Sequence, residues 1–278
     1  MQTTDHTDQK SAYEISEIPG GVDRELERLR NQALLSWARE ERHLRWFGLR
    51  DGMSVLDVGS GPGFVSGQLL DMLPNGSVTA LEIDPVMIER AEKYLAGRTG
   101  ERLRLVQGSL MNSGLPLASY DFAYARLVFQ HLPDPVAAAR EIKHLLKPGG
   151  KLVIMDIDDR LHLFDPEDPP EVQAISNRFI EEHKQKGGDR NIGRKLLRIL
   201  RDAGYVDVSL DLIGVHSDEY GIDTMAPVAG DDAYRALLEE GKITEEELEL
   251  MVAADKRAHE PDAISMYVIF TASGTKPE

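Results

Sequence analysis

Cysteine is absent from this chain of 278 residues. The protein can therefore form no disulfide, no thiolate metal site and no cysteine nucleophile. Long apolar runs are missing as well, because the clean hydrophobic stretches have only the length of strands, and the opening segment MQTTDHTDQK has no apolar core of the kind found in a secretory signal. We therefore expect no membrane span and a cytoplasmic location.

Positive charge is also in short supply. Lysine and arginine together number 32 against 48 aspartates and glutamates, which gives a formal net charge of −16. The basic clusters are scattered or flanked by acids, and aromatic residues make up only 6% of the chain. This composition disfavours RNA, DNA or an anionic membrane surface as a partner. No paired-histidine spacing such as H-E-x-x-H occurs, so no metal site is predicted.

The hydrophobic pattern alternates between strands and helices. Short apolar runs predict strands, and segments with helical apolar spacing follow most of them. Such alternation is typical of an α/β fold with a mostly parallel sheet covered on both faces. We predict a doubly wound sheet of seven strands, at residues 55–58, 77–83, 103–106, 121–127, 151–157, 205–213 and 264–271.

The segments outside this regular pattern suggest a division of the chain. Residues 1–47 are predicted to form an N-terminal tail, to about residue 20, and then a helical cover of one or two helices. Residues 48–278 are predicted to form the main domain. Two segments interrupt that domain, at about 158–190 and at about 217–262, where two helices are expected. One insert follows the fifth strand and the other lies between the final two strands, and we interpret both as helical caps over a site.

One glycine-rich stretch, M-S-V-L-D-V-G-S-G-P-G at residues 53–63, links a predicted strand to a predicted helix. This order lets the main chain approach a ligand closely and points helix N–H groups at it. A phosphate-binding P-loop requires a lysine that is absent here, and the dinucleotide pattern G-x-G-x-x-G fails because its last position is Phe64. What remains is D-x-G-x-G-x-G, in which Asp57 repels a pyrophosphate and suits a cationic ligand.

Five motifs in order then carry a resemblance to a known family. They are V-L-D-V-G-S-G-P-G, L-E-I-D-P-V-M-I, G-S-L-(x)4-L-P-L-(x)3-D-F, H-L-P-D-P and L-L-K-P-G-G-K-L. With these motifs the chain resembles the class I S-adenosylmethionine-dependent methyltransferases, in particular the small-molecule enzymes related to ubiquinone and menaquinone biosynthesis. The resemblance covers residues 50–157 well and 193–213 more loosely. It implies a Rossmann-like fold, S-adenosylmethionine as cofactor and a small-molecule substrate; a homodimer remains open.

The resemblance also implies roles for individual residues. Glu82 is expected to accept hydrogen bonds from both ribose hydroxyls, and Asp84 to cap the helix that Pro85 opens. Ser109 departs from the family pattern, in which many relatives carry aspartate at the adenine. Arg126 is expected to face the methionine end of the cofactor. The predicted cofactor-binding residues are Asp57, Gly59, Ser60, Gly61, Gly63, Glu82, Ile83, Gly108, Ser109, Leu110 and Arg126.

Catalytic residues are much less defined by the sequence. Methyl transfer depends mainly on alignment, and a general base is needed only when the acceptor must lose a proton. The candidates for such a role or for substrate contact are His131, Asp156, His162 and Tyr13, with His183 as a further histidine. Arg28 and Gln32 could reach the cofactor carboxylate if their helix folds over the site, and residues 187–191 could form part of the pocket.

Two other functions stay open at this point. One is a nicotinamide-dependent oxidoreductase, which the failed G-x-G-x-x-G spacing disfavours. The other is a methyltransferase-like protein that binds or regulates a partner without catalysis. The acceptor atom, whether O, N or C, does not follow from the sequence, because one fold supports many functions.

Overall fold

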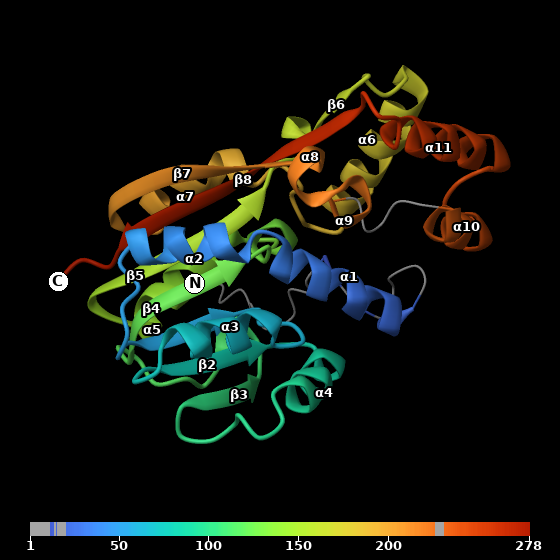
Figure 1. Ribbon diagram of the computed structural model, residues 1–278. Coiled ribbons are helices and arrows are strands. Elements are labelled where there is room, and N and C mark those ends of the chain that lie inside the picture. The colour runs from blue at the N-terminus through green and yellow to red at the C-terminus, as the bar shows by residue number, and fades with distance from the viewer. Residues whose placement is uncertain (1–11, 14, 16–20, 226–230) are drawn as a thin grey trace, which may run out of the picture.

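A single sheet of eight strands forms the centre of the computed structural model, which describes residues 12, 13, 15, 21–225 and 231–278 (Figure 1). Most of the predicted N-terminal tail lies outside the described residues. The strands are β1 (Ser54–Val58), β2 (Ser77–Glu82), β3 (Leu103–Gln107), β4 (Tyr120–Arg126), β5 (Leu146–Ile157), β6 (Leu163–Asp165), β7 (Val206–His216) and β8 (Ile264–Thr275).

The sheet is mostly parallel, as predicted. Strands β3, β2, β1, β4 and β5 lie side by side in that order and pair in parallel. Strand β8 then runs antiparallel to β5 and to β7. The eighth strand, which the sequence did not predict, is β6, whose three residues pair with the start of β8. A segment this short carries too few residues for a recognisable alternation.

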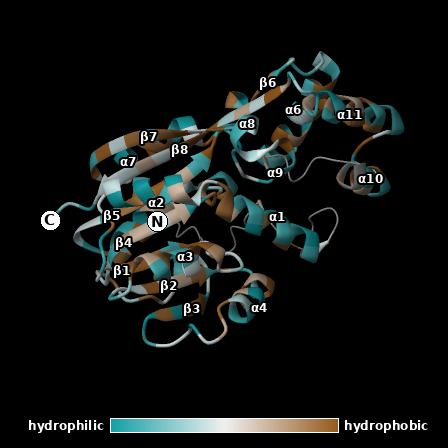
Figure 2. Cartoon of the chain, viewed as in Figure 1, coloured by the Kyte–Doolittle hydropathy of each residue, from teal (hydrophilic) through white to brown (hydrophobic). Residues whose placement is uncertain are grey.

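Side-chain alternation along the strands creates two cores, one on each face of the sheet. In β4, Phe122 and Tyr124 join the cluster that packs against the helices α2 (Trp37–Trp46) and α3 (Phe64–Met72). Ala123 and Ala125 point the other way, to the cluster formed with α5 (Pro135–Leu145) and α7 (Leu196–Asp202). In Figure 2 the strands are accordingly rich in hydrophobic residues. In a parallel sheet with helices on both faces, ligands bind at the edge formed by the carboxyl ends of the strands.

The remaining helices cover that edge or its surroundings. They are α1 (Val22–Leu35), α4 (Pro85–Tyr94), α6 (Pro170–Gln185), α8 (Ser217–Tyr220), α9 (Ile222–Met225), α10 (Asp231–Glu239) and α11 (Glu245–Ala258). The prediction of two helices between about 217 and 262 was too low, because α8 and α9 are single turns that leave little periodic signal. Thr244 and Glu247 form a reciprocal capping box at the start of α11. No helix in the described ranges is both long enough and apolar enough to cross a membrane.

The helical cover is joined to the sheet by a buried ion pair. Ser36 separates α1 from α2 and donates a hydrogen bond from its hydroxyl to Glu40 Oε1 at 2.6 Å. Glu40 is fully buried and accepts both Nε and Nη2 of Arg126, from the end of β4, at 2.8 and 2.9 Å. Arg126 Nη2 also donates to the carbonyl of Gln32 on α1 at 2.7 Å. One guanidinium therefore holds α1 and α2 together against the sheet.

This arrangement predicts that Glu40→Ala is strongly destabilising. Removing one partner leaves the Arg126 charge buried without compensation, and the expected loss of unfolding free energy is about 3 kcal/mol or more. Glu41→Ala is the matched control, because Glu41 forms only a surface pair with Arg45 and should change stability by less than about 0.5 kcal/mol. Urea unfolding of both variants measures the difference. Equal losses in the two would contradict this account of the pair.

Candidate active site

The glycine turn after β1 lies at the point where the strand order reverses, between β1 and β4. Gly59 has a φ of 65°, and a Cβ there would lie 2.6 Å from Val128 Cγ2, so only glycine fits. Gly61 has a φ of 52°, but a Cβ there would meet no atom of the described residues within 4 Å. Gly59 thus permits close packing onto the loop after β4, whereas Gly61 leaves open space above the main chain.

Two buried polar side chains lie beside this turn. Asp57, on β1, accepts a hydrogen bond from the Ser66 hydroxyl at 2.6 Å, and burial raises the pKa of Asp57 to about 7. The Oγ of Ser60 is buried and has no hydrogen-bond partner among the residues that the structure describes. Both residues line a cavity of about 810 Å³. Buried polar atoms are normally satisfied, so the free Ser60 oxygen indicates a site that expects a polar ligand or water.

Glu82, at the end of β2, connects this turn to the neighbouring strand. Its Oε2 accepts the N–H of Gly61 at 2.8 Å, and its Oε1 accepts the N–H groups of Ile83 and Asp84 at 2.8 and 2.9 Å. Burial raises the pKa of Glu82, and these backbone donors partly offset the shift. Asp84 caps α4 through the N–H groups of Val86 and Met87, as expected. Glu82 is thus held by main chain with its carboxylate at the cavity wall.

The turn after β3 forms the next part of the wall. The N–H of Gly108 donates to the carbonyl of Glu82 at 2.8 Å, which aligns this turn with the end of β2. Ser109 accepts the N–H of Met111 at 3.3 Å and begins a 3₁₀ turn at Leu110. Gly108, Ser109 and Leu110 all line the cavity.

Arg126 also lines the cavity, but its guanidinium is bound by protein groups, the Glu40 carboxylate and the Gln32 carbonyl. Burial alone would lower the pKa of Arg126, and the adjacent Glu40 carboxylate more than reverses this effect. The family resemblance implied that Arg126 faces the methionine end of the cofactor, where its guanidinium could pair with the cofactor carboxylate or with an acidic substrate. In the structure, Arg126 Nε and Nη2 are engaged by Glu40 and by the Gln32 carbonyl.

Helix α1 closes the cavity on the side of the helical cover. Glu25 is buried and pairs with Arg28, with Nε–Oε2 and Nη2–Oε1 distances of 2.6 Å each. The hydroxyl of Tyr13 donates to Glu25 Oε1 at 2.7 Å. Tyr13, Arg28 and Gln32 line the cavity. The expectation that the leading helix folds over the site therefore agrees with the observed position of α1.

Three histidines of the sequence prediction line the same cavity. The ring of His131 lies 5.2 Å from Tyr13 and 5.2 Å from His183, measured between ring centroids. Burial, together with the nearby charges of His183 and Arg190, holds the pKa of His131 well below its ordinary value. His162 packs 4.3 Å from Phe164, and its Nε2 lies 2.9 Å from the Ser265 hydroxyl. All three candidates are neutral bases or hydrogen-bonding groups near neutral pH.

Asp156 differs from the other candidates because it is fully buried and does not line the cavity. Its Oδ2 accepts the N–H of Gln130 at 3.1 Å and its Oδ1 accepts the N–H of Ile157 at 3.0 Å. Burial raises the pKa of Asp156 to about 7. Alternation along β5 explains the placement: Met155 and Ile157 face the cavity, and the side chain between them points away. Asp156 is therefore not placed to contact a substrate directly.

Comparisons with known proteins agree with this geometry. Residues 56–154 match the family model described as a methyltransferase domain. A demethylmenaquinone methyltransferase of Geobacillus sp. (strain WCH70) is 25% identical over 66% of this chain and 85% of its own length. Residues 56–154 are therefore similar to methyltransferase domains.

Two further comparisons describe the reach of this methyltransferase similarity. An uncharacterised 37.1 kDa protein of a Streptomyces fradiae transposon is 32% identical over 63% of this chain, which spans half the length of that relative. A phosphoethanolamine N-methyltransferase of Haemonchus contortus, solved with S-adenosylhomocysteine, has the same fold, with a TM-score of 0.56 and 17% identity over 94% of this chain and 54% of that one.

The residues of this cavity fit S-adenosylmethionine. The open space over Gly61 admits a ligand against the main chain, the free Ser60 hydroxyl can bond to it, and Glu82 presents carboxylate oxygens at the same wall. Each oxygen keeps capacity for further donors. Within the described residues no group of three or more His, Asp or Glu side chains is arranged to hold a metal ion.

The sequence prediction missed three polar residues: Glu25 and Gln130, which line the cavity, and Glu40, which binds Arg126. Glu25 is buried on α1 together with the apolar Ala33, and Glu40 is buried on α2 together with the apolar Trp37. A glutamate on an apolar helix face indicates a buried ion pair, because a carboxylate is rarely buried without a partner. Gln130 carries no such signal, since most of its partners come from β5 and from the first cap segment, far away in the chain.

The raised pKa of Asp57 predicts a pH effect on stability. The folded protein keeps this proton up to about pH 7, whereas the unfolded chain releases it near 3.8. Unfolding free energy should therefore fall as pH rises through this window, by at most about 1.4 kcal/mol per pH unit for one proton. In Asp57→Asn this contribution disappears and the slope becomes shallower. Urea unfolding at several pH values measures it, and an unchanged slope would refute the assignment.

Proposed function

We propose that this protein transfers the methyl group of S-adenosylmethionine to a small molecule. The proposal rests chiefly on one observation, the Gly61 main chain that faces open cavity while its N–H is held by the buried Glu82 carboxylate. This contact supports the proposal because it puts the glycine turn and Glu82, the proposed ribose-binding acid, on one wall of the cavity. When bound, S-adenosylmethionine supplies a methyl group on a positively charged sulfur that is already activated for attack.

We assign cofactor roles to residues on the glycine side of the cavity. Glu82 is proposed to accept the ribose hydroxyls, and the turn at Ser109 and Leu110 to hold the adenine. Asp57 is proposed to act from below the turn, through Ser66. Arg126 is proposed to act at the methionine end mainly by anchoring Gln32 and α1 there. The complete proposed set remains Asp57, Gly59, Ser60, Gly61, Gly63, Glu82, Ile83, Gly108, Ser109, Leu110 and Arg126.

The acceptor is proposed to bind on the cap side of the same cavity. Residues from α6, α9, α10 and β8 line this side, together with His131, His162 and Tyr13. These three side chains can orient an acceptor or receive its proton. The name of the Geobacillus relative favours a quinone-type acceptor, and specialised metabolism is the wider expectation. We also propose that residues 1–47 form a helical cover over the main domain and that the segments at about 158–190 and 217–262 form its caps. A cytoplasmic location and a homodimer are further proposals.

Calorimetric titration of S-adenosylhomocysteine and NAD(H), side by side, tests the cofactor. Binding of S-adenosylhomocysteine alone is expected, because the turn lacks the dinucleotide spacing. Binding of NAD(H) alone would overturn the proposal. Tight cofactor binding with a preferred protein partner and no turnover of any acceptor would favour the non-catalytic alternative.

Glu82→Ala is expected to weaken S-adenosylhomocysteine binding tenfold or more, because a charge-assisted contact contributes roughly 1.5–3 kcal/mol. Glu89→Ala is the control, since Glu89 lies on the exposed face of α4 and pairs with Lys93. Calorimetry gives both affinities. An unchanged affinity in Glu82→Ala would remove the ribose assignment.

Gly61→Ala tests whether the open space over the turn holds the cofactor. The new methyl group meets no described atom but enters the cavity. Gly52→Ala is the matched control, because Gly52 also has a positive φ and open surroundings, at the opposite end of β1. Both changes should cost about 1 kcal/mol of stability through the left-handed backbone, and only Gly61→Ala should weaken S-adenosylhomocysteine binding. Equal affinities would show that the cofactor does not pack there.

A further inference from the structure

The loop between β4 and α5 contacts both sides of the cavity. At its start Leu127 has a φ of 57°, an unfavourable conformation for a residue other than glycine. The N–H of Leu127 donates to the carbonyl of Met155 at 2.7 Å. The next residue, Val128, packs over Gly59 so closely that no Cβ fits between them. Both Leu127 and Val128 line the cavity. The loop therefore contains a strained residue, Leu127, and packs directly against the glycine turn through Val128.

Gln130 secures this loop from several directions, although it is only 3% exposed. Its N–H donates to Asp156 on β5, and its side-chain Nε2 donates to the Leu127 carbonyl at 3.4 Å. Strained backbone persists where its surroundings determine it. The buried Asp156 carboxylate, which lies outside the cavity, thus influences the site through Gln130.

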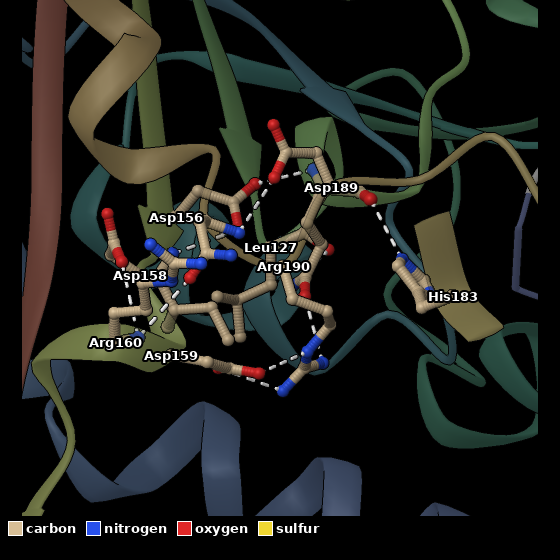
Figure 3. Close-up of polar contacts among 11 residues, drawn as sticks. Leu127, Asp156, Asp158, Asp159, Arg160, His183, Asp189 and Arg190 are labelled. Atoms are coloured by element: carbon tan, nitrogen blue, oxygen red, sulfur yellow. Dashed lines mark hydrogen bonds and ion pairs between the residues drawn. The ribbon is translucent and has the colours of Figure 1, made fainter. Parts of the chain in front are cut away.

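The same residue holds the first cap segment. The Gln130 carbonyl accepts His183 Nε2 at 2.9 Å and the N–H of Asp189 at 2.7 Å. Its side-chain Oε1 accepts Arg190 Nη1 at 3.0 Å. Arg190 in turn pairs with Asp159, with Nε–Oδ2 and Nη2–Oδ1 distances of 2.7 and 3.1 Å. Figure 3 shows Asp156, Asp159, His183, Asp189 and Arg190 gathered around this point.

These contacts place one residue between the two halves of the cavity. On one side is the loop that packs on Gly59, and on the other are His183, Arg190 and Asp159, which line the cap side. His131 follows Gln130 directly, and its ring contacts His183. A shift of the loop must therefore move the Gln130 oxygens that accept hydrogen bonds from the first cap segment.

We propose that Gln130 is a positioning residue that makes the acceptor-side wall respond to the cofactor. Contact with the cofactor reduces the motion of the loop, and the loop in turn fixes the carbonyl and side-chain oxygens of Gln130. These oxygens accept hydrogen bonds from His183, Asp189 and Arg190 and so order them before the methyl-acceptor substrate binds. Because coupling is reciprocal, an ordered cap also strengthens cofactor binding. The proposal rests on the proposed function, since it takes S-adenosylmethionine as the ligand of the glycine turn.

Hydrogen exchange of the full chain with and without S-adenosylhomocysteine tests this coupling. In the natural protein the ligand is expected to slow exchange of amides in residues 183–191, including Asp189. Gln130→Met keeps the side-chain volume but loses the bonds to Arg190 and Leu127, so this slowing should be lost. Affinity should fall by about fivefold, the lower end of typical coupling. Gln130→Glu, which retains an oxygen for Arg190, should recover most of the slowing.

Two controls separate coupling from general damage. Gln173→Met changes a glutamine on the exposed face of α6, in the same cap segment, and should respond as the natural protein does. Peptides from β1 to β3 should gain protection in every variant. Slowing that persists in Gln130→Met, or is absent in a natural protein that binds the ligand, would overturn the inference. Failure of the natural protein to bind S-adenosylhomocysteine would instead refute the proposed function.

Discussion

The pairing of Glu40 with Arg126 is the constraint on which the cavity depends. A buried carboxylate requires a partner, and the partner here comes from the last residue of β4, at the ligand edge of the sheet. The same guanidinium binds the Gln32 carbonyl, which brings α1 across the cavity. Without that helix, the site would lack Glu25 and Arg28 on one wall, and Tyr13 would lose its hydrogen bond to Glu25. The ion pair therefore joins the helical cover to the sheet edge, and the cover forms one wall of the cavity.

The central sheet could be predicted from the sequence because its signals are local. Apolar runs such as Val55–Val58, the prolines that open α4 and α5, and the glycine turn each depend on neighbouring residues. The start of β5 was placed too late, at Lys151 rather than Leu146, because K-P-G-G indicates a turn. The short elements β6, α8 and α9 depend on tertiary pairing, for which their few residues give no periodic signal.

The site divides in a similar way. The residues predicted at the glycine turn, at Glu82 and at Ser109 lie together at one wall, because each group follows a parallel strand. Gly63 is the exception, since it does not line the cavity and packs against Leu95 and Ala91. Asp156 also follows this logic by position in the chain, yet the pleat directs its side chain away from the cavity. Apart from the nearby Leu127 carbonyl, the partners of Gln130 described above lie between 26 and 60 positions away in the chain. Such contacts could not be read from one sequence.

Strand β8 carries a consequence for the order of folding. It pairs with β5, β6 and β7, and it follows all of them in the chain. In the described part of the protein, β6 and β7 have no other strand partner. During synthesis, both must wait with unpaired edges until β8 leaves the ribosome, while β1 to β5 can already assemble. Long-range pairing of this kind is slow and exposes unpaired edges. The last strand thus seals the sheet and, through β6, the cap in a single late step.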